Sequence, residues 1–218
     1  MKKILLLGDS IRMGYEEYVK QSFDGVVDVY FPNVNCAFAQ NMLRYLNIWK
    51  NEQKIPDDID LVHFNVGLWD VLRIYDDGTL TSPEYYAEIL PRIIKRIKIL
   101  FPKAKIVFAL STNVYEEGYK TTPPYARLNA DVEKFNKIAV DVLKPLGVFI
   151  NDLYAITKDL PADSSCRSDM THFNTDDGVN LLGGQVTKTI CSLLDIPLES
   201  INKISAKGRI ISEKVLRN

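Results

Sequence analysis

The chain has 218 residues, of which 46% are hydrophobic and 25% are charged, so it holds enough apolar material for the core of a globular domain. Its 27 basic and 28 acidic side chains leave a formal charge of -1, which excludes the basic surface that a protein needs to bind a phosphate backbone. We therefore expect one domain and no nucleic-acid partner.

The expected strands and helices alternate along the chain. Short apolar runs bounded by turn residues predict five buried strands, at 4–7, 26–31, 61–66, 106–110 and 148–150. Segments with helical spacing follow them at 15–23, 37–49, 83–100, 128–143 and 176–194. Ser82 and Pro83 predict the start of the third helix, and Pro102 its end. This alternation predicts an α/β fold in which helices cover both faces of a parallel sheet.

Residues 1–198 are predicted to form this domain, and residues 199–218 a C-terminal extension. The extension lies beyond the break at Pro197, is rich in Lys and Arg, and keeps several aliphatic residues. It would pack either on the domain or on a second copy of the chain, which would make a homo-oligomer. The sequence leaves both alternatives open.

The cysteines and the N-terminus bear on where the protein works. Cys36, Cys166 and Cys191 are an odd number without CxxC spacing, so they predict neither a disulfide framework nor a zinc cluster. The apolar run at 4–7 is too short for the core of a signal peptide, and no apolar stretch approaches the length of a membrane span. We expect a cytoplasmic protein without a membrane span.

Polar residues just after the strands are the first candidates for a site, because open parallel sheets bind ligands beyond the carboxyl ends of their strands. Gly8-Asp9-Ser10 follows the first strand. There Gly8 permits a tight turn, and Ser10 stands near a helix start, where free backbone N–H groups favour developing negative charge. Asp9 and Ser10 would serve equally well as helix caps. The block on its own therefore leaves a nucleophile and a cap as alternatives.

A nucleophilic serine needs a base, and the chain has only two histidines. His63 lies inside the third apolar run and is predicted to be a core residue. His172 lies in a polar loop before the last helix, three residues after Asp169. At that spacing Asp169 can accept a hydrogen bond from the imidazole and select its tautomer. The alternative is an Asx turn beside a solvent-exposed histidine.

Together, Gly8-Asp9-Ser10 after the first strand and Asp169-x-x-His172 before the last helix resemble the first and last blocks of the SGNH (GDSL-type) hydrolases. The resemblance spans about residues 3–195. It implies a flavodoxin-like three-layer α/β/α sandwich with a five-stranded parallel sheet. The chain also lacks the Gly-x-Ser-x-Gly elbow of the ordinary α/β-hydrolases.

The same resemblance implies a carboxylic ester hydrolase with a triad of Ser10, His172 and Asp169, which needs no cofactor and no metal. Its partner would be a small-molecule ester, and we expect a short acyl group such as acetyl on a carbohydrate or other small molecule. The alternatives are a lysophospholipase or thioesterase with the same triad, or a non-catalytic ligand-binding relative. A nucleotide-binding flavodoxin-like protein would need a Gly-rich loop where this chain has Asp9.

The middle blocks depart from the family pattern and resemble a distinct subgroup of it. The second block reads Asn35-Cys36, without the glycine whose N–H the family places in the oxyanion hole. The third reads Gly67-Leu68-Trp69-Asp70, with Trp69 where the family has a donor asparagine. We therefore expect Ser10, Asn35 and Cys36 to form the oxyanion hole.

The remaining candidates border the expected cleft. Gly67, Trp69 and Asn113 are predicted to contact the substrate, although Trp69 would serve as well in packing. Asn65, within the third strand, is predicted to hydrogen-bond a neighbouring loop. Asp76 and Asp77 stand before a glycine, which favours a solvated turn over a metal site.

Overall fold

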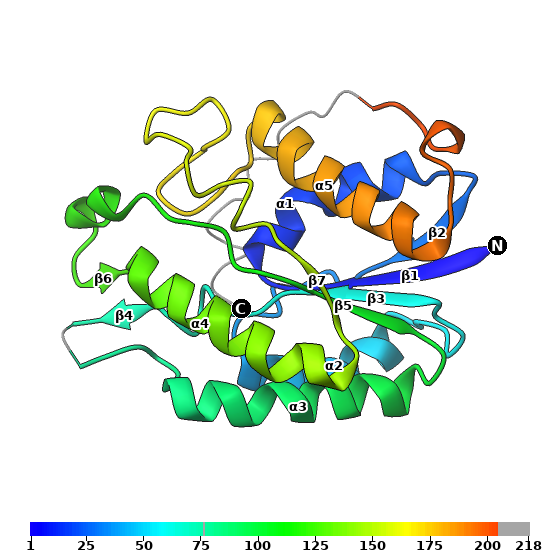
Figure 1. The fold of residues 1–218 in the computed structure, drawn as a ribbon, viewed down its shortest axis with the longest axis horizontal. Coiled ribbons are helices and arrows are strands. Elements are labelled where there is room, and N and C mark those ends of the chain that lie inside the picture. The colour runs from blue at the N-terminus through cyan, green and yellow to red at the C-terminus, as the bar shows by residue number, and fades with distance from the viewer. Residues whose placement is uncertain (76, 205–218) are drawn as a thin grey trace.

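The computed structural model describes residues 1–75 and 77–204 of the chain, and its centre is a five-stranded parallel sheet (Figure 1). The strands are β1 (Lys2–Leu7), β2 (Val27–Tyr30), β3 (Leu61–Phe64), β5 (Lys105–Ala109) and β7 (Phe149–Asn151). They lie in the order β2-β1-β3-β5-β7, with every neighbouring pair parallel. This is the flavodoxin-like order. The predicted α/β fold and its five parallel strands are confirmed.

Helices cover both faces of the sheet (Figure 1). They are α1 (Ser10–Ser22), α2 (Ala39–Glu52), α3 (Pro83–Leu100), α4 (Asn129–Leu143) and α5 (Asp176–Leu194). α1 packs against α5 on one face, and α3 packs between α2 and α4 on the other. The central strands are therefore shielded on both sides, and the last four residues of β1, an isoleucine followed by leucines, are fully buried.

The helix boundaries follow from local chemistry. The Ser82 hydroxyl accepts the N–H of Tyr85, and Pro83 occupies the first turn, so α3 begins where it was predicted. α1 begins at Ser10, and the prediction of a start at residue 15 was wrong. The first turns of α1 carry Arg12 facing the core, and this buried charge hides the apolar period that marks a helix.

Two long loops at the carboxyl end of the sheet are joined by a small sheet that was not predicted. Its strands are β4 (Arg73–Ile74), after β3, and β6 (Tyr125–Ala126), after β5, and they pair antiparallel. The short 3-10 helices η1 (Glu116–Thr121), η2 (Lys144–Leu146) and η3 (Leu198–Ser200) complete the secondary structure of the described residues. Figure 1 places β4 and β6 side by side beyond the main sheet, so they stand over the edge where ligands of this fold bind.

The described part of the C-terminal extension returns to α1. The Asn202 side chain donates to the carbonyl oxygens of Gln21 and Asp24, at 3.1 and 3.0 Å. Residues 205–218 lie outside the described residues, so their role in assembly and the domain boundary at residue 198 stay predictions. Within the part of the chain that the structure covers, no helix is both long enough and apolar enough to cross a membrane.

Candidate active site

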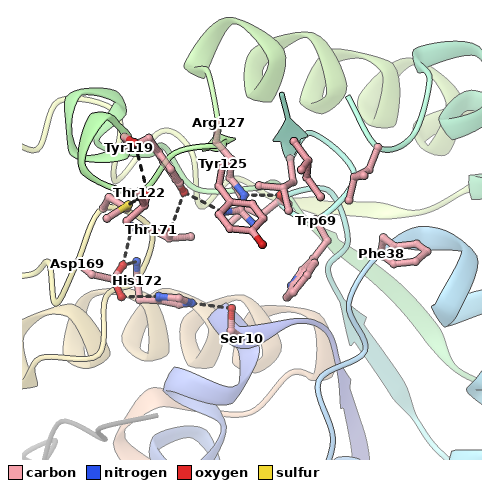
Figure 2. A pocket seen from close by; sticks show the side chains of 15 residues that line it. Ser10, Phe38, Trp69, Tyr119, Thr122, Tyr125, Arg127, Asp169, Thr171 and His172 are labelled. Carbon is pink, nitrogen blue, oxygen red and sulfur yellow. Dashed lines mark hydrogen bonds and ion pairs between the residues drawn. The ribbon is translucent and has the colours of Figure 1, made fainter. Parts of the chain in front are cut away.

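Ser10, His172 and Asp169 form one hydrogen-bonded chain at the carboxyl end of the sheet (Figure 2). Ser10 opens α1 directly after the β1 turn, whereas the other two lie in the loop between β7 and α5. His172 Nε2 is 2.8 Å from Ser10 Oγ, and His172 Nδ1 is 2.7 Å from Asp169 Oδ2. The fold thus brings together residues that are 162 positions apart.

The Asp169 carboxylate selects the tautomer of the neutral imidazole. Burial alone would raise the pKa of Asp169, but the hydrogen bond and charge of His172 and the N–H groups of Thr171 and His172 outweigh it and lower the pKa to about 2. An ionised carboxylate only accepts, so Nδ1 of His172 carries the ring hydrogen. His172 Nε2 is then the acceptor, and it faces the Ser10 hydroxyl.

The turn that presents Ser10 depends on Gly8 and Asp9. A Cβ atom at Gly8 would lie 1.9 Å from Asn65 Oδ1, so only glycine lets the main chain pass this close to the Asn65 side chain. Asp9 Oδ1 accepts the Ile11 N–H at 2.9 Å, which caps α1, and it also accepts from Asn65 Nδ2 at 2.8 Å. Burial raises the pKa of the Asp9 carboxyl in spite of these bonds. Asp9 is therefore the cap, and Asn65 bonds a neighbouring loop as predicted.

Arg12 is a positioning residue that the sequence reasoning missed. Its guanidinium is fully buried, is paired with Glu16, and donates to the carbonyl oxygens of Gly8, Pro32 and Val34. These bonds tie the turn before Ser10 to the loop after β2. The signal was present in the sequence as Arg12 and Glu16 at i and i+4, a spacing that places two opposite charges on one helix face.

Asn35 and Cys36 were both predicted to donate to the oxyanion, but of the two only Asn35 has a donor without a partner among the described residues. The Cys36 N–H donates to the Gly8 carbonyl oxygen at 3.0 Å, which corrects the expectation that this group serves the oxyanion hole. Asn35 Oδ1 accepts the Ala37 N–H at 2.8 Å, and this bond assigns the other end of the amide as nitrogen. Asn35 Nδ2 is buried and has no partner among the described residues. It is therefore an amide donor in a loop that is bonded to the Ser10 turn.

A cavity of about 660 Å³ opens beside Ser10, His172 and Asp169. Its walls are mostly apolar or aromatic, and they come from the loops that follow β2, β3, β5 and β7. The lining residues are Ser10, Phe38, Leu68, Trp69, Leu72, Ile74, Leu80, Tyr119, Thr122, Tyr125, Arg127, Asp169, Met170, Thr171 and His172. Figure 2 shows Trp69 and Tyr125 facing the space next to Ser10 and His172. A cavity of this size and lining is typical of small-molecule sites.

Of the predicted substrate contacts, Trp69 lines the cavity, but Gly67 and Asn113 do not. Gly67 is packed against Ser111, whose hydroxyl would lie 2.3 Å from a Cβ at this position. The Asn113 side chain donates to the Lys158 carbonyl oxygen and accepts from Arg167, which holds it in a buried network. Gly67 and Asn113 therefore support the loops around the cavity, which corrects the expectation that they line the substrate site.

Tyr119 and Arg127 line the cavity and were not singled out from the sequence. Arg127 Nε donates to the Leu68 carbonyl oxygen at 2.6 Å, and its Nη1 donates to the Tyr119 hydroxyl at 2.9 Å. The Tyr119 and Thr171 hydroxyls are 2.5 Å apart. The sequence signal was weak, because both residues stand in an irregular loop whose path is set by its contacts with β4. Across the described residues, no three His, Cys, Asp or Glu side chains are grouped so that they could hold a metal ion.

Comparisons with known proteins find relatives by structure only. No protein-family model matches the sequence, and no curated protein matches it. Among solved structures, a lipase/acylhydrolase from Enterococcus faecalis is 21% identical with a TM-score of 0.68, over 94% of this chain and 100% of that chain. A GDSL-like lipase from Bacteroides thetaiotaomicron is 13% identical with a TM-score of 0.63, over 88% of this chain and 89% of that chain. An acetyl xylan esterase is 16% identical with a TM-score of 0.63, over 86% of this chain and 99% of that chain. The chain shares the fold of these three proteins along nearly its whole length.

Proposed function

We propose that this chain is a serine ester hydrolase of the SGNH (GDSL) type. The observation that carries the proposal is the hydrogen-bonded chain from Ser10 through His172 to Asp169 at the edge of a cavity. A serine, an imidazole in the right tautomer and an ionised carboxylate are the parts that acyl transfer requires. The names of the structural neighbours, a lipase/acylhydrolase and an acetyl xylan esterase among them, agree with this chemistry.

The reaction proceeds in two steps. His172 Nε2 takes the proton of the Ser10 hydroxyl as Oγ attacks the ester carbonyl, and it then gives this proton to the leaving alcohol, which leaves an acyl-Ser10. A water molecule, deprotonated by His172, attacks the acyl carbonyl. His172 then returns this proton to Ser10 Oγ as the acyl–oxygen bond breaks, and the carboxylic acid leaves. Asp169 stays ionised and stabilises the imidazolium that forms in each step, because its pKa lies far below neutral.

For the substrate, we propose first a short acyl group such as acetyl on a carbohydrate or other small molecule. The similarity in fold to an acetyl xylan esterase supports this choice. Aromatic side chains beside the triad, Trp69 and Tyr125, provide flat surfaces on which a substrate ring can pack.

A longer acyl chain, as in a lysophospholipid or a thioester, is the second candidate. The cavity of about 660 Å³ exceeds the size of an acetyl group, and its lining includes the apolar side chains of Phe38, Leu72, Ile74 and Leu80. Apolar walls favour an apolar ligand group, since each methylene that leaves water contributes about 0.8 kcal/mol.

The decisive experiment combines a covalent probe with the Ser10→Ala variant. A fluorophosphonate should add its mass to the peptide that contains Ser10, and Ser10→Ala should neither be labelled nor hydrolyse esters, with a loss in kcat on the order of a thousandfold or more. Circular dichroism of the variant controls for folding. Labelling at Cys36, or near-normal turnover in Ser10→Ala, would contradict the proposal.

A series of p-nitrophenyl esters from acetate to decanoate, beside acetylated xylan, then separates the two substrate candidates by kcat/KM.

A further inference from the structure

Arg127 places a positive charge in the wall of the cavity. Among the residues that the structure describes, it is the only lysine or arginine in that wall. Its guanidinium carbon lies 6.0 Å from the centre of the Trp69 ring and 5.8 Å from that of the Tyr119 ring. Figure 2 shows the side chain between Tyr119, Tyr125 and Trp69, above the space that faces Ser10.

No carboxylate within the described ranges forms an ion pair with Arg127. Its two hydrogen-bond partners, the Leu68 carbonyl and the Tyr119 hydroxyl, are neutral. Asp9 is close enough to sense the charge, but its carboxylate bonds Ile11 and Asn65. Because no carboxylate of the described residues neutralises this half-buried cation, an anion that enters the cavity would be bound favourably.

The hydroxyl groups next to Arg127 help to hold it in place. Arginine only donates, so the Tyr119 oxygen accepts from it, and the Tyr119 and Thr171 hydroxyls share a second hydrogen bond in which either can donate. Thr171 also lines the cavity. The bonds to Leu68 and Tyr119 use Nε and Nη1 and hold the guanidinium plane, which leaves Nη2 as a fixed, charged donor.

The geometry points to Arg127 as the specificity-determining residue of this site: it selects esters whose acyl or alcohol part carries an anionic group, such as a carboxylate or phosphate. The inference rests on the proposed ester hydrolysis and narrows its substrate class. The apolar side chains of the cavity then receive the uncharged part of the same molecule, while Arg127 Nη2 binds the anionic oxygen atoms.

Two matched ester pairs test the inference. 4-Acetoxybenzoate and its methyl ester differ in charge on the alcohol side, and p-nitrophenyl glutarate and p-nitrophenyl butyrate differ in charge on the acyl side. We expect the wild-type protein to favour the anionic member of at least one pair in kcat/KM. In Arg127→Gln the ratio of anionic to neutral kcat/KM should fall about tenfold or more, because a charge-assisted hydrogen bond is lost. Arg127→Lys, which keeps the charge, should hold an intermediate ratio.

Lys120→Gln is the matched control. Lys120 lies in η1, seven positions before Arg127, is exposed, pairs with Glu117 and does not line the cavity. Its removal changes the net charge of the same loop without touching the site, so the ratio should stay at the wild-type value. A wild-type protein without charge preference in either pair, or an Arg127→Gln variant that loses both members of a pair equally, would overturn the inference.

Binding separates this inference from the proposed function. In a Ser10→Ala background, calorimetry should show that 4-acetoxybenzoate binds more tightly than its methyl ester, and Arg127→Gln should remove that difference in affinity. If Ser10 is labelled and neutral esters are cleaved but no charge preference exists in rate or binding, the role of Arg127 alone is wrong. If Ser10 is not labelled and no ester is cleaved, the proposed function is wrong, and the binding comparison still decides whether Arg127 selects an anion.

Discussion

Single donor atoms decide how well the site could stabilise an oxyanion. The resemblance to the SGNH hydrolases implies that Trp69 stands where those proteins have a side-chain donor, and the Cys36 N–H is bonded to the Gly8 carbonyl oxygen. Asn35 Nδ2 is buried and has no partner among the described residues, whereas Oδ1 of the same amide is held by Ala37. A buried donor without an acceptor is costly in the resting protein, and a developing negative charge would satisfy it.

We therefore expect Asn35→Asp to reduce kcat about a hundredfold to a thousandfold with little change in KM. Aspartate keeps the acceptor for the Ala37 N–H but replaces the donor by a charged acceptor, so the loss combines the missing donor with the repulsion of the oxyanion, and Asn35→Ala measures the missing donor without that charge. Steady-state kinetics on p-nitrophenyl acetate provide the measurement, and Asn35→Ala provides the comparison. Equal rates in Asn35→Asp and the wild type would exclude Asn35 from the oxyanion hole.

At the scale of elements, Asp70 joins the start of α2 to the loop after β3. Its carboxylate accepts the Ala39 N–H at 3.2 Å and the Thr81 hydroxyl at 2.8 Å. Arg12 makes a similar connection between α1 and the loop after β2. The loops that carry Phe38, Trp69 and the other cavity residues are therefore anchored by buried polar side chains that hydrogen-bond the main chain, which gives the cavity a defined shape.

Asp70 predicts a pH dependence of stability. Burial raises the pKa of its carboxyl from 3.8 to about 6, in spite of the hydrogen bonds from Thr81 and Ala39. The folded state thus binds this proton more tightly than the unfolded state, so the contribution is fully present below the unfolded pKa and is lost as the pH rises through about 6. Between about pH 4 and pH 7, the free energy of unfolding of the wild type should fall relative to that of Asp70→Asn by on the order of 2 kcal/mol.

Urea unfolding of both proteins at several pH values measures this difference, and groups common to both cancel. A stability difference between wild type and Asp70→Asn that stays constant over this range would contradict the assignment of a protonated, buried Asp70.

For the molecule as a whole, one polar network links the sheet to the helical layer. His63 on β3 is fully buried, and its Nε2 lies 3.1 Å from the Asn151 side-chain nitrogen on β7. Gln185 on α5 donates to the other end of the Asn151 amide at 3.2 Å. This network holds His63 far from the Ser10 site in a role that is structural, as its place in an apolar run predicted.

Burial lowers the pKa of His63 from 6.5 to about 3. The stabilising contribution of neutral His63 is therefore present above the unfolded pKa and is lost as the pH falls toward 3. Between about pH 7 and pH 5, the free energy of unfolding of the wild type should fall by on the order of 1 to 2 kcal/mol relative to that of His63→Gln, measured by urea unfolding.

His63→Ala should lower the free energy of unfolding more than it lowers kcat. A variant with normal stability and no activity would reverse the roles assigned to the two histidines.

Much of the fold and the main candidate residues could be predicted from the sequence, because the signals are local. The apolar runs of β1 and β3, the cap at Ser82 and the Asp169-x-x-His172 spacing are each read within a few residues. Parallel strands also place their carboxyl ends at one edge, so Ser10 and the last loop could be expected to meet there.

The three-dimensional packing was needed for everything that depends on contacts between distant loops. The Cys36 N–H donates to the Gly8 carbonyl oxygen, and the Asn113 side chain is held by Lys158 and Arg167. None of these three bonds leaves a pattern in the sequence. Arg127 reaches the cavity because the adjacent strand β6 pairs with β4, where the paired residues Tyr125 and Ile74 are 51 positions apart in the chain. Leu68 and Tyr119 then orient its guanidinium. Local periodicity reports which residues share a face of one element, whereas the position of a loop side chain depends on the packing of the other loops around it.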